Sequence, residues 1–552
     1  MSEYLLGSRK MKPFPVAMSL VASYISGVTI LGTPAEIYNY GTQYWLIIFA
    51  IILSGFAVST VYLPVFTKLE VGSSYEYLER RFSSTVRSIA SIMFVFDELM
   101  FLPIVLLVPA LITGLNIYLI AGVMCSVCVF YTFVGGIKAV VHTDAWQIFV
   151  MFISVIVVVV LGTIQQTGGI SKVFETASDG GRIKLLNLNP SMYERHTFWG
   201  VLFGGFTYWT SFNSVNQTMV QRYMSLPSLK KARQSIFIFT IGVVIFISVC
   251  CYAGILIYAR FKNCDPKTAG LVETDDQLFP FYVMNTVGQL RGIPGLFIAG
   301  IFGAALSSLS VVLNSTAGVL LEDIFRGCFK GQPSEKVSSM IVKGSILVLG
   351  ALSMVFLLIV EKLGGVLEVA TSLSSIAAGT TFGVFTLGML FPSTNNFGAI
   401  SGMIAGALSS GWISFGTQIA IASGAVLPHR LNMSIANCDV LSVHVNNSLT
   451  FMEHDESGVF PLHRLSFLWI NPIGVASVCI VGVIVSYLTG PRDLRDIDPD
   501  LISPVIHRFL PEECFQRDEK KDDQLGPGPF ILEETMHIFA LNRYLNIANR
   551  EL

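Results

Sequence analysis

Three long apolar stretches of the chain carry an unusual number of oxygen-bearing side chains. Residues 293–321 contain Ser307, Ser308 and Asn314, and residues 198–221 contain the run TYWTSFNSVNQTMVQRY. Hydroxyl oxygens and unpaired backbone carbonyls are the ligands that a hard cation such as sodium prefers. Small polar side chains also pack membrane helices against one another, so any single serine is open to either interpretation. Three such stretches in one chain favour a cation site at membrane depth.

The third stretch, residues 15–40, is apolar enough to enter a bilayer but poorly suited to a continuous helix. Its middle is rich in small and β-branched residues, and Thr33 and Pro34 follow them. Proline removes a backbone donor and disfavours the helix before it. Because lipid offers no hydrogen bonds, an interrupted membrane helix must face protein or a wet cavity, where its freed carbonyls can hold an ion. We therefore expect this helix to be broken at a binding site.

The composition indicates the elements that must position these groups. Of the 552 residues, 53% are hydrophobic and only 13% are charged, whereas a typical soluble domain has about 25% charged residues. This composition predicts a polytopic membrane protein. The formal net charge of −2 argues against nucleic-acid binding. The chain contains no His-Glu-x-x-His or Gly-x-Ser-x-Gly signature, so we do not expect an enzyme.

Segments of about 20 apolar residues mark the expected membrane spans. We count twelve: residues 13–38, 44–66, 86–112, 115–135, 144–164, 198–221, 234–259, 293–321, 337–361, 364–392, 396–424 and 467–489. Lys and Arg gather in the loops that follow the even-numbered spans, and cytoplasmic loops carry such an excess. We therefore expect a multi-pass plasma-membrane protein with a cytoplasmic N-terminus (1–12) and a solvated cytoplasmic tail (491–552).

The same topology places the loop of residues 425–466 outside the cell. This loop carries the sequons that begin at Asn432 and Asn446, which are candidate glycosylation sites. Cys264 and Cys438 both fall in loops on this side, where oxidising conditions permit a disulfide. We treat these two cysteines as a candidate pair.

At these residues the chain resembles the sodium/solute symporter family. Matching runs extend almost from end to end: SEYLLGSR, LGTPAEIYNYG, SSYEYLERRF, YTFVGGIKAVVHTDAWQ, NQTMVQRY, IPGLFIAGIFGAALSSLS and LLEDIF. The Thr-Pro-Ala-Glu motif and the VGGIKAVVHTD run are most similar to the branch that transports monocarboxylates, multivitamins and iodide. They are less similar to the sugar-transporting branch.

The resemblance implies an all-α leucine-transporter-like fold. In that fold, residues 13–164 and 198–392 form inverted five-helix repeats, spans one and six are broken, and spans 11 and 12 (396–490) follow. Matched by position, sodium would be bound by the carbonyls of Ala22, Ile25 and Ala304 and the hydroxyls of Ser307 and Ser308. The residues implied to line the substrate cavity are Tyr24, Thr29, Thr33, Trp209, Phe212 and Asn213. Asp144 matches an aspartate near the inward cation path, although an acid at the start of a helix also stabilises the helix dipole.

The activity implied is symport by alternating access, in which co-transported sodium drives the import of a small organic anion, either a monocarboxylate or a vitamin such as biotin or pantothenate. An inorganic-anion symporter of the sodium/iodide type is an alternative. The sequence indicates the lipid bilayer as surroundings and no obligate protein partner.

The chain departs from the family in three places. Family members of this branch usually begin with an extra helix, whereas Met1 lies just before the first core span. The end of span three is shortened to VPALITGLN, and Asp97 and Glu98 lie inside that span. Acids inside a membrane are costly and indicate function by default. These departures keep a further alternative open, a solute sensor or scaffold of the same fold that binds without transporting.

Overall fold

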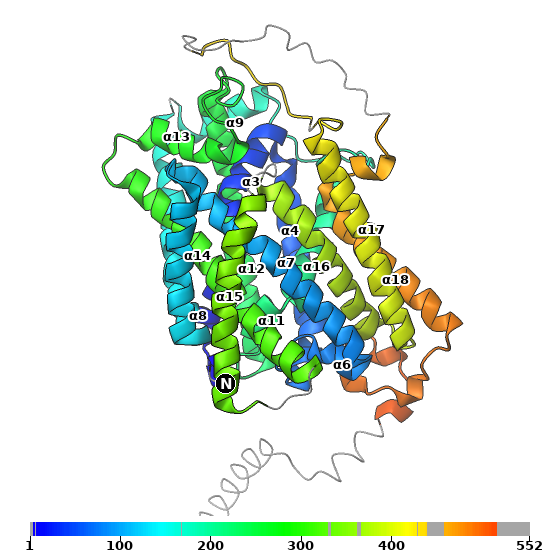
Figure 1. The fold of residues 1–552 in the computed structure, drawn as a ribbon. Helices are drawn as coiled ribbons and strands as arrows, with labels where there is room; N and C mark the ends of the chain where they lie inside the picture. The colour runs from blue at the N-terminus through cyan, green and yellow to red at the C-terminus, as the bar shows by residue number, and fades with distance from the viewer. Residues whose placement is uncertain are drawn as a thin grey trace, which may run out of the picture.

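The computed structural model describes residues 4–5, 7–166, 168–328, 333–360, 366–427, 429–438 and 458–515. This part of the chain is mainly helical and contains no strand, and its helices pack side by side in one bundle (Figure 1). The α-helices are α2 (Pro13–Tyr24), α3 (Gly27–Tyr40), α4 (Ile47–Ala57), α5 (Leu63–Leu69), α6 (Glu76–Arg81), α7 (Ser84–Thr113), α8 (Ile117–Gln165), α9 (Gly169–Asp179), α10 (Gly205–Val215), α11 (Gln217–Tyr223), α12 (Leu229–Phe261), α13 (Leu278–Val287), α14 (Ile293–Val319), α15 (Glu335–Val360), α16 (Val366–Leu390), α17 (Asn396–Ala422) and α18 (Ile470–Leu488). Turns of π-helix join α4 to α5 (Val58–Tyr62), lead into α10 (Gly200–Gly204) and continue α14 (Leu320–Cys328).

The predicted all-α membrane fold is confirmed. Within the described residues, eight helices are long and apolar enough to cross a membrane, or nine if the bent pair α2 and α3 is one span. Each of the twelve predicted spans lies on a helix or on two helices joined by a break. Large apolar side chains such as Phe56, Phe130 and Trp146 are largely exposed, as expected of surfaces that face lipid rather than water.

Helix α8 holds two predicted spans in one 49-residue run, and Gly136 divides them. Its φ of 57° and ψ of −156° are non-helical, a conformation open to glycine and strained for other residues. Tyr131 donates to the Leu306 carbonyl at 2.8 Å, and Asp144 accepts from Ser307 at 2.8 Å. Both halves of α8 therefore reach the same turn of α14, so the chain turns back at Gly136.

Helix α14 lies inside the bundle, where it packs against α8, α7 and α2. Helices α16, α17 and α18 pack together on another side, as Figure 1 shows. The figure also separates two ends of the bundle, one carrying α9 and α13 and the other carrying α6. We refer to them as the α9 end and the α6 end.

The expectation of a solvated tail is wrong for its described part, residues 491–515. Ile497 and Ile502 are buried there, and the Tyr77 hydroxyl donates to the Leu501 carbonyl at 3.0 Å. Ser503 donates its backbone N–H to the Met389 carbonyl at 3.1 Å, so this segment is fixed to the α6 end. The contact is made by apolar residues that alternate with charged ones. Because of the charges, the sequence pattern gave no sign of a buried segment. The rest of the tail and Asn446 lie outside the described residues.

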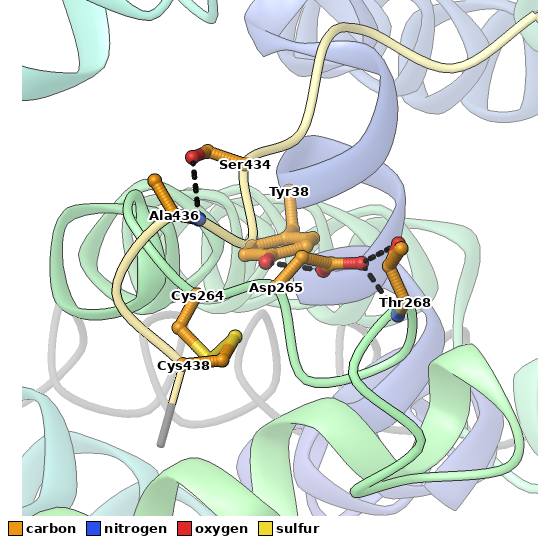
Figure 2. The surroundings of a disulfide bond; sticks show 7 residues. All are labelled: Tyr38, Cys264, Asp265, Thr268, Ser434, Ala436 and Cys438. Atoms are coloured by element: carbon orange, nitrogen blue, oxygen red, sulfur yellow. Dashed lines mark hydrogen bonds between the residues drawn. A yellow bond between two sulfur atoms is a disulfide. The ribbon is translucent and has the colours of Figure 1, made fainter. Parts of the chain in front are cut away.

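At the α9 end, a disulfide joins Cys264 and Cys438, which are 174 positions apart in the sequence (Figure 2). Beside it, Asp265 accepts a hydrogen bond from the Tyr38 hydroxyl at 2.6 Å and holds Thr268 through the other carboxylate oxygen. The Asp265 backbone N–H donates to the Ser434 carbonyl at 2.8 Å. The disulfide segment is thereby tied to α3, the second half of the first broken span.

Candidate functional site

The first span is broken at Ile25 and Ser26, where α2 and α3 meet at an angle of 57°. Four hydrogen bonds mark the break: from Ile25 N–H to the Val21 carbonyl, from Ser26 N–H to the Tyr24 carbonyl, and from the N–H groups of Thr29 and Ile30 to the Ser26 carbonyl. Within the described residues, none of these bonds ends on the carbonyls of Ala22 or Ile25. The last carbonyls of a helix have no partner inside it, so these two are available to a ligand.

Gly27, the first residue of α3, packs tightly against α7. A Cβ at this residue would lie 2.6 Å from Cγ1 of Val108 on α7 and 3.7 Å from Cγ2 of Ile301 on α14. Only glycine fits so close to Val108, because real Cβ contacts are longer. Pro34, by contrast, lies inside α3 without ending it. The expected break is therefore present, but eight residues before the proline.

The second broken span consists of α10 and α11, which are separated at Asn216. This residue has extended backbone, with φ of −63° and ψ of 131°, and its side chain accepts a hydrogen bond from Thr218 N–H at 2.8 Å. Such a side-chain bond satisfies one of the free donors at a helix start. Asn216 therefore ends one helix and caps the next.

Asp144 connects α2, α8 and α14 in the centre of the bundle. It is fully buried and accepts hydrogen bonds from the hydroxyls of Ser19 at 2.6 Å and Ser307 at 2.8 Å. Arg222 donates to the Ser19 hydroxyl at 2.9 Å and lies 3.6 Å from the carboxylate. Asp144 lies two turns beyond the break at Gly136, so a role at a helix N-terminus is excluded.

The residues matched to the sodium site lie next to this network. Ala22, Ile25 and Ala304 are fully buried, and Ala304 shares one face of α14 with Ser307 and Ser308 at i+3 and i+4. The Ser308 hydroxyl is buried and has no hydrogen-bond partner within the described part of the chain. A buried polar atom without a partner costs free energy and calls for an explanation. A bound cation would supply the missing partner, because other oxygen atoms surround this position.

A central cavity of about 120 Å³ lies beside the break in the first span. Its lining includes five of the six residues matched to the substrate site: Tyr24, Thr29, Thr33, Trp209 and Phe212. The rings of Tyr24 and Trp209 are stacked with their centroids 3.8 Å apart. Asn213 is not part of this lining, because its amide turns back to donate to the Trp209 carbonyl at 2.7 Å.

Several groups that the family match did not include also line the central cavity. They are Asp97 and Glu98 on α7, Tyr208 on α10, and Asn471 at the start of α18. The sequence does mark the two acids, because a charged residue inside a predicted membrane span is unusual. Nothing local marks Asn471, because it follows a loop far along the chain and reaches the cavity only through folding.

A second cavity, of about 460 Å³, lies at the α9 end, and Phe467 lines both it and the central cavity. Beside it, Arg195 donates through Nε to Glu36 Oε1 at 2.5 Å and through Nη2 to Oε2 at 3.1 Å. The Arg195 guanidinium also lies 4.2 Å from the centroid of the Tyr40 ring. This ion pair holds α3, the second half of the first span. Nothing in the sequence marks the pair, since 159 positions separate its members.

Comparison with known proteins agrees with this geometry. The pattern of the sodium:solute symporter family matches residues 4–406. Sodium-coupled monocarboxylate transporter 2 of Mus musculus is 35% identical, over 93% of this chain and 82% of the relative. The sodium-dependent multivitamin transporter of Oryctolagus cuniculus is 35% identical, over 92% of this chain and 81% of the relative. The solved structure of a Na+-coupled sialic acid symporter in its substrate-bound, outward-open state has a TM-score of 0.72 at 23% identity and covers 89% of this chain and 93% of that one.

The fold with its two broken helices is of the leucine-transporter-like class, and the family match and the relatives show sodium-coupled symport. The chain belongs to the sodium:solute symporter family, whose members are transporters and not enzymes.

Proposed function

We propose that this protein is a sodium-coupled symporter that carries a small organic solute across the plasma membrane into the cell by alternating access. The observation that carries this proposal is the central cavity, which adjoins the break in the first span and is lined by oxygen-bearing side chains of both broken spans, among them Ser23, Thr29 and Thr218. Family membership supports sodium coupling. The same fold could bind solute without moving it, so flux and not binding is the decisive measurement.

Sodium is proposed to bind between α2 and α14. The carbonyls of Ala22, Ile25 and Ala304 and the hydroxyls of Ser307 and Ser308 would supply five oxygens, the ligand type that a hard cation prefers. The partnerless Ser308 hydroxyl supports this assignment. Since Ser307 already donates its hydrogen to Asp144, its oxygen lone pairs remain for the ion, and we assign Asp144 to orienting that hydroxyl beside the inward cation path.

The solute is proposed to occupy the central cavity between α7, the two broken helices and α18. The names of the relatives make monocarboxylates and vitamins the first candidate substrates. Movement of the repeat 13–164 against the repeat 198–392 would open the cavity to each side in turn. In this arrangement the α9 end faces outward, both termini are cytoplasmic, and the exposed Asn432 is a candidate glycan acceptor.

The charge of the solute sets the driving force. One positive charge moving through ~100 mV contributes roughly 2.3 kcal/mol, which at ~1.4 kcal/mol per decade is roughly fortyfold accumulation. A neutral solute with one sodium ion gains all of this electrical contribution, whereas a monovalent anion with one sodium ion gains none of it.

The test is tracer uptake into proteoliposomes that contain the purified full chain, with an inward sodium gradient or with equal sodium on both sides. Gradient-driven uptake that disappears when an ionophore dissipates the gradient is expected. Saturable solute binding without gradient-driven accumulation would contradict symport and support the sensor alternative.

A further inference from the structure

We propose that the solute carried in the central cavity bears a protonated amine. This inference rests on the proposed function, because it concerns the substrate class of the same site. It departs from the small organic anion that the sequence led us to expect. Three independent features of the cavity carry it: its formal charge, its aromatic wall and one buried acceptor atom.

The first feature is charge. Asp97 and Glu98 both line the cavity, and none of the lining residues in the described chain is Lys, Arg or His. Glu98 is buried, and Asp97 lines a small cavity together with Val215 and Asn216, at the break between α10 and α11. The acidic pair therefore lies against the second broken helix. A carboxylate solute would meet two protein carboxyl groups with no protein cation to offset them, whereas an ammonium group would meet its natural partners.

The second feature is the aromatic wall. Trp209 stacks on Tyr24, and Phe212 meets the Tyr24 ring edge-on with centroids 5.5 Å apart. Tyr208 and Phe101 line the same cavity. Aromatic faces carry partial negative charge and attract alkylammonium and guanidinium groups, and this attraction strengthens when water is excluded. Acids beside stacked aromatic rings thus favour a cation with an organic body over a bare metal ion.

The third feature is an acceptor atom without a donor. Asn471 is 1% exposed, and its side-chain amide donates to the Ser211 hydroxyl at 3.3 Å. Its carbonyl oxygen, Oδ1, is buried and has no hydrogen-bond partner among the residues the structure describes. Asn471 lines the cavity, so this oxygen is available to a ligand that donates hydrogen bonds. A protonated amine donates, whereas a carboxylate only accepts.

The test compares two solutes of similar shape and opposite charge, 3-methylbutylamine and 3-methylbutanoate, each as a tracer. Uptake into proteoliposomes with the full chain is measured with and without a sodium gradient, and the sodium-dependent part is retained. We expect amine uptake at least tenfold above carboxylate uptake. The double variant Asp97→Asn/Glu98→Gln should lower amine uptake at least tenfold and so remove this preference. Glu175→Gln, an exposed acid on α9 away from the cavity, should leave it unchanged.

Each outcome bears on a different claim. Carboxylate uptake that exceeds amine uptake in the wild type would overturn this inference and leave symport standing, as would amine uptake that survives in the double variant. Carboxylate uptake that depends on the square of the sodium concentration would assign the acids to a second sodium ion instead. Absence of sodium-dependent uptake of both solutes would overturn the proposed function and the inference together. Thermal stabilisation of the double variant by sodium confirms that it is folded.

Discussion

Replacing Ser308 by alanine should weaken sodium binding without lowering the stability of the sodium-free protein. The Ser308 hydroxyl has no hydrogen-bond partner in the described chain, so its removal takes no protein contact away. An unsatisfied buried polar group costs roughly 1–3 kcal/mol, and the sodium-free variant should therefore be as stable as the wild type or more stable. A hydroxyl that contacts a charged group contributes about 1.5–3 kcal/mol. At ~1.4 kcal/mol per decade, losing it raises the half-saturating sodium concentration roughly 10- to 150-fold.

Ser307→Ala should behave differently, although the two serines are adjacent. Ser307 donates to the buried Asp144 carboxylate at 2.8 Å. Its loss leaves that carboxylate with Ser19 and a guanidinium 3.6 Å away. We expect about 1.5–3 kcal/mol of destabilisation even without sodium, because a hydrogen bond to a charged group is lost. Sodium affinity should fall as well.

The assay is thermal unfolding of the purified protein followed by tryptophan fluorescence during a sodium titration. Potassium, not an organic cation, replaces sodium, because the cavity is itself proposed to bind amines. Ser315→Ala is the matched control, since Ser315 is fully buried on the same helix but donates to carbonyls of its own helix, those of Val311 and Val312. It should leave the sodium half-saturation constant unchanged.

Two results would refute this reasoning. If Ser308→Ala destabilised the sodium-free protein as much as Ser307→Ala, the Ser308 hydroxyl would be a packing element and not a ligand. If neither variant changed the half-saturating sodium concentration, the ion would bind elsewhere.

Three further outcomes follow from single contacts. Gly27→Ala should lower the free energy of unfolding by about 1–3 kcal/mol through overpacking. Adding Val108→Ala should restore it, because the new Cβ meets Val108 at 2.6 Å. Gly122→Ala is the control in the same melts and should not destabilise the protein, since the nearest neighbour of its Cβ is 4.0 Å away. Cys264→Ser should cost roughly 2–4 kcal/mol and make the melting temperature insensitive to dithiothreitol, whereas a melting temperature equal to that of the oxidised wild type would contradict a role for the disulfide. Arg81→Met should cost roughly 2–6 kcal/mol, since it strips donors from two buried carbonyls at and after the end of α16, those of Gly388 and Thr394, and an unchanged denaturation midpoint would count against this.

The sequence predicted the helices well, because membrane spans are long and uniformly apolar. It also predicted that the first span is broken, since small and β-branched residues weaken a helix locally. The break lies at Ile25 and Ser26, among those small residues, while the helix runs on through Pro34. The sequence did not show the close approach of Gly27 to Val108, because a contact between helices 81 positions apart leaves no local signal.

The ion pair between Glu36 and Arg195 is a second contact that the sequence could not reveal. Glu36 and Arg195 come from α3 and from a loop, and each looks like an ordinary polar residue in its own segment. Asn213 shows the converse. The family match placed it at the substrate cavity, but its amide donates to the Trp209 carbonyl, one turn earlier in its own helix. Residue type therefore indicated which segments form the site, and packing decided which atoms reach it.

The proposed sodium ligands and the acidic pair of the proposed solute site lie on different helices. The proposed sodium ligands lie on α2 and α14, whereas the acidic pair Asp97 and Glu98 lies on α7. Changing α7 can therefore alter the charge of the solute without altering the ion site. The energetic consequence is large, since a cationic solute with one sodium ion moves two charges and gains about 4.6 kcal/mol at ~100 mV, while an anion with one sodium ion gains nothing electrically. If the proposal holds, two side chains on one helix influence both which solute enters and how strongly the membrane potential drives it.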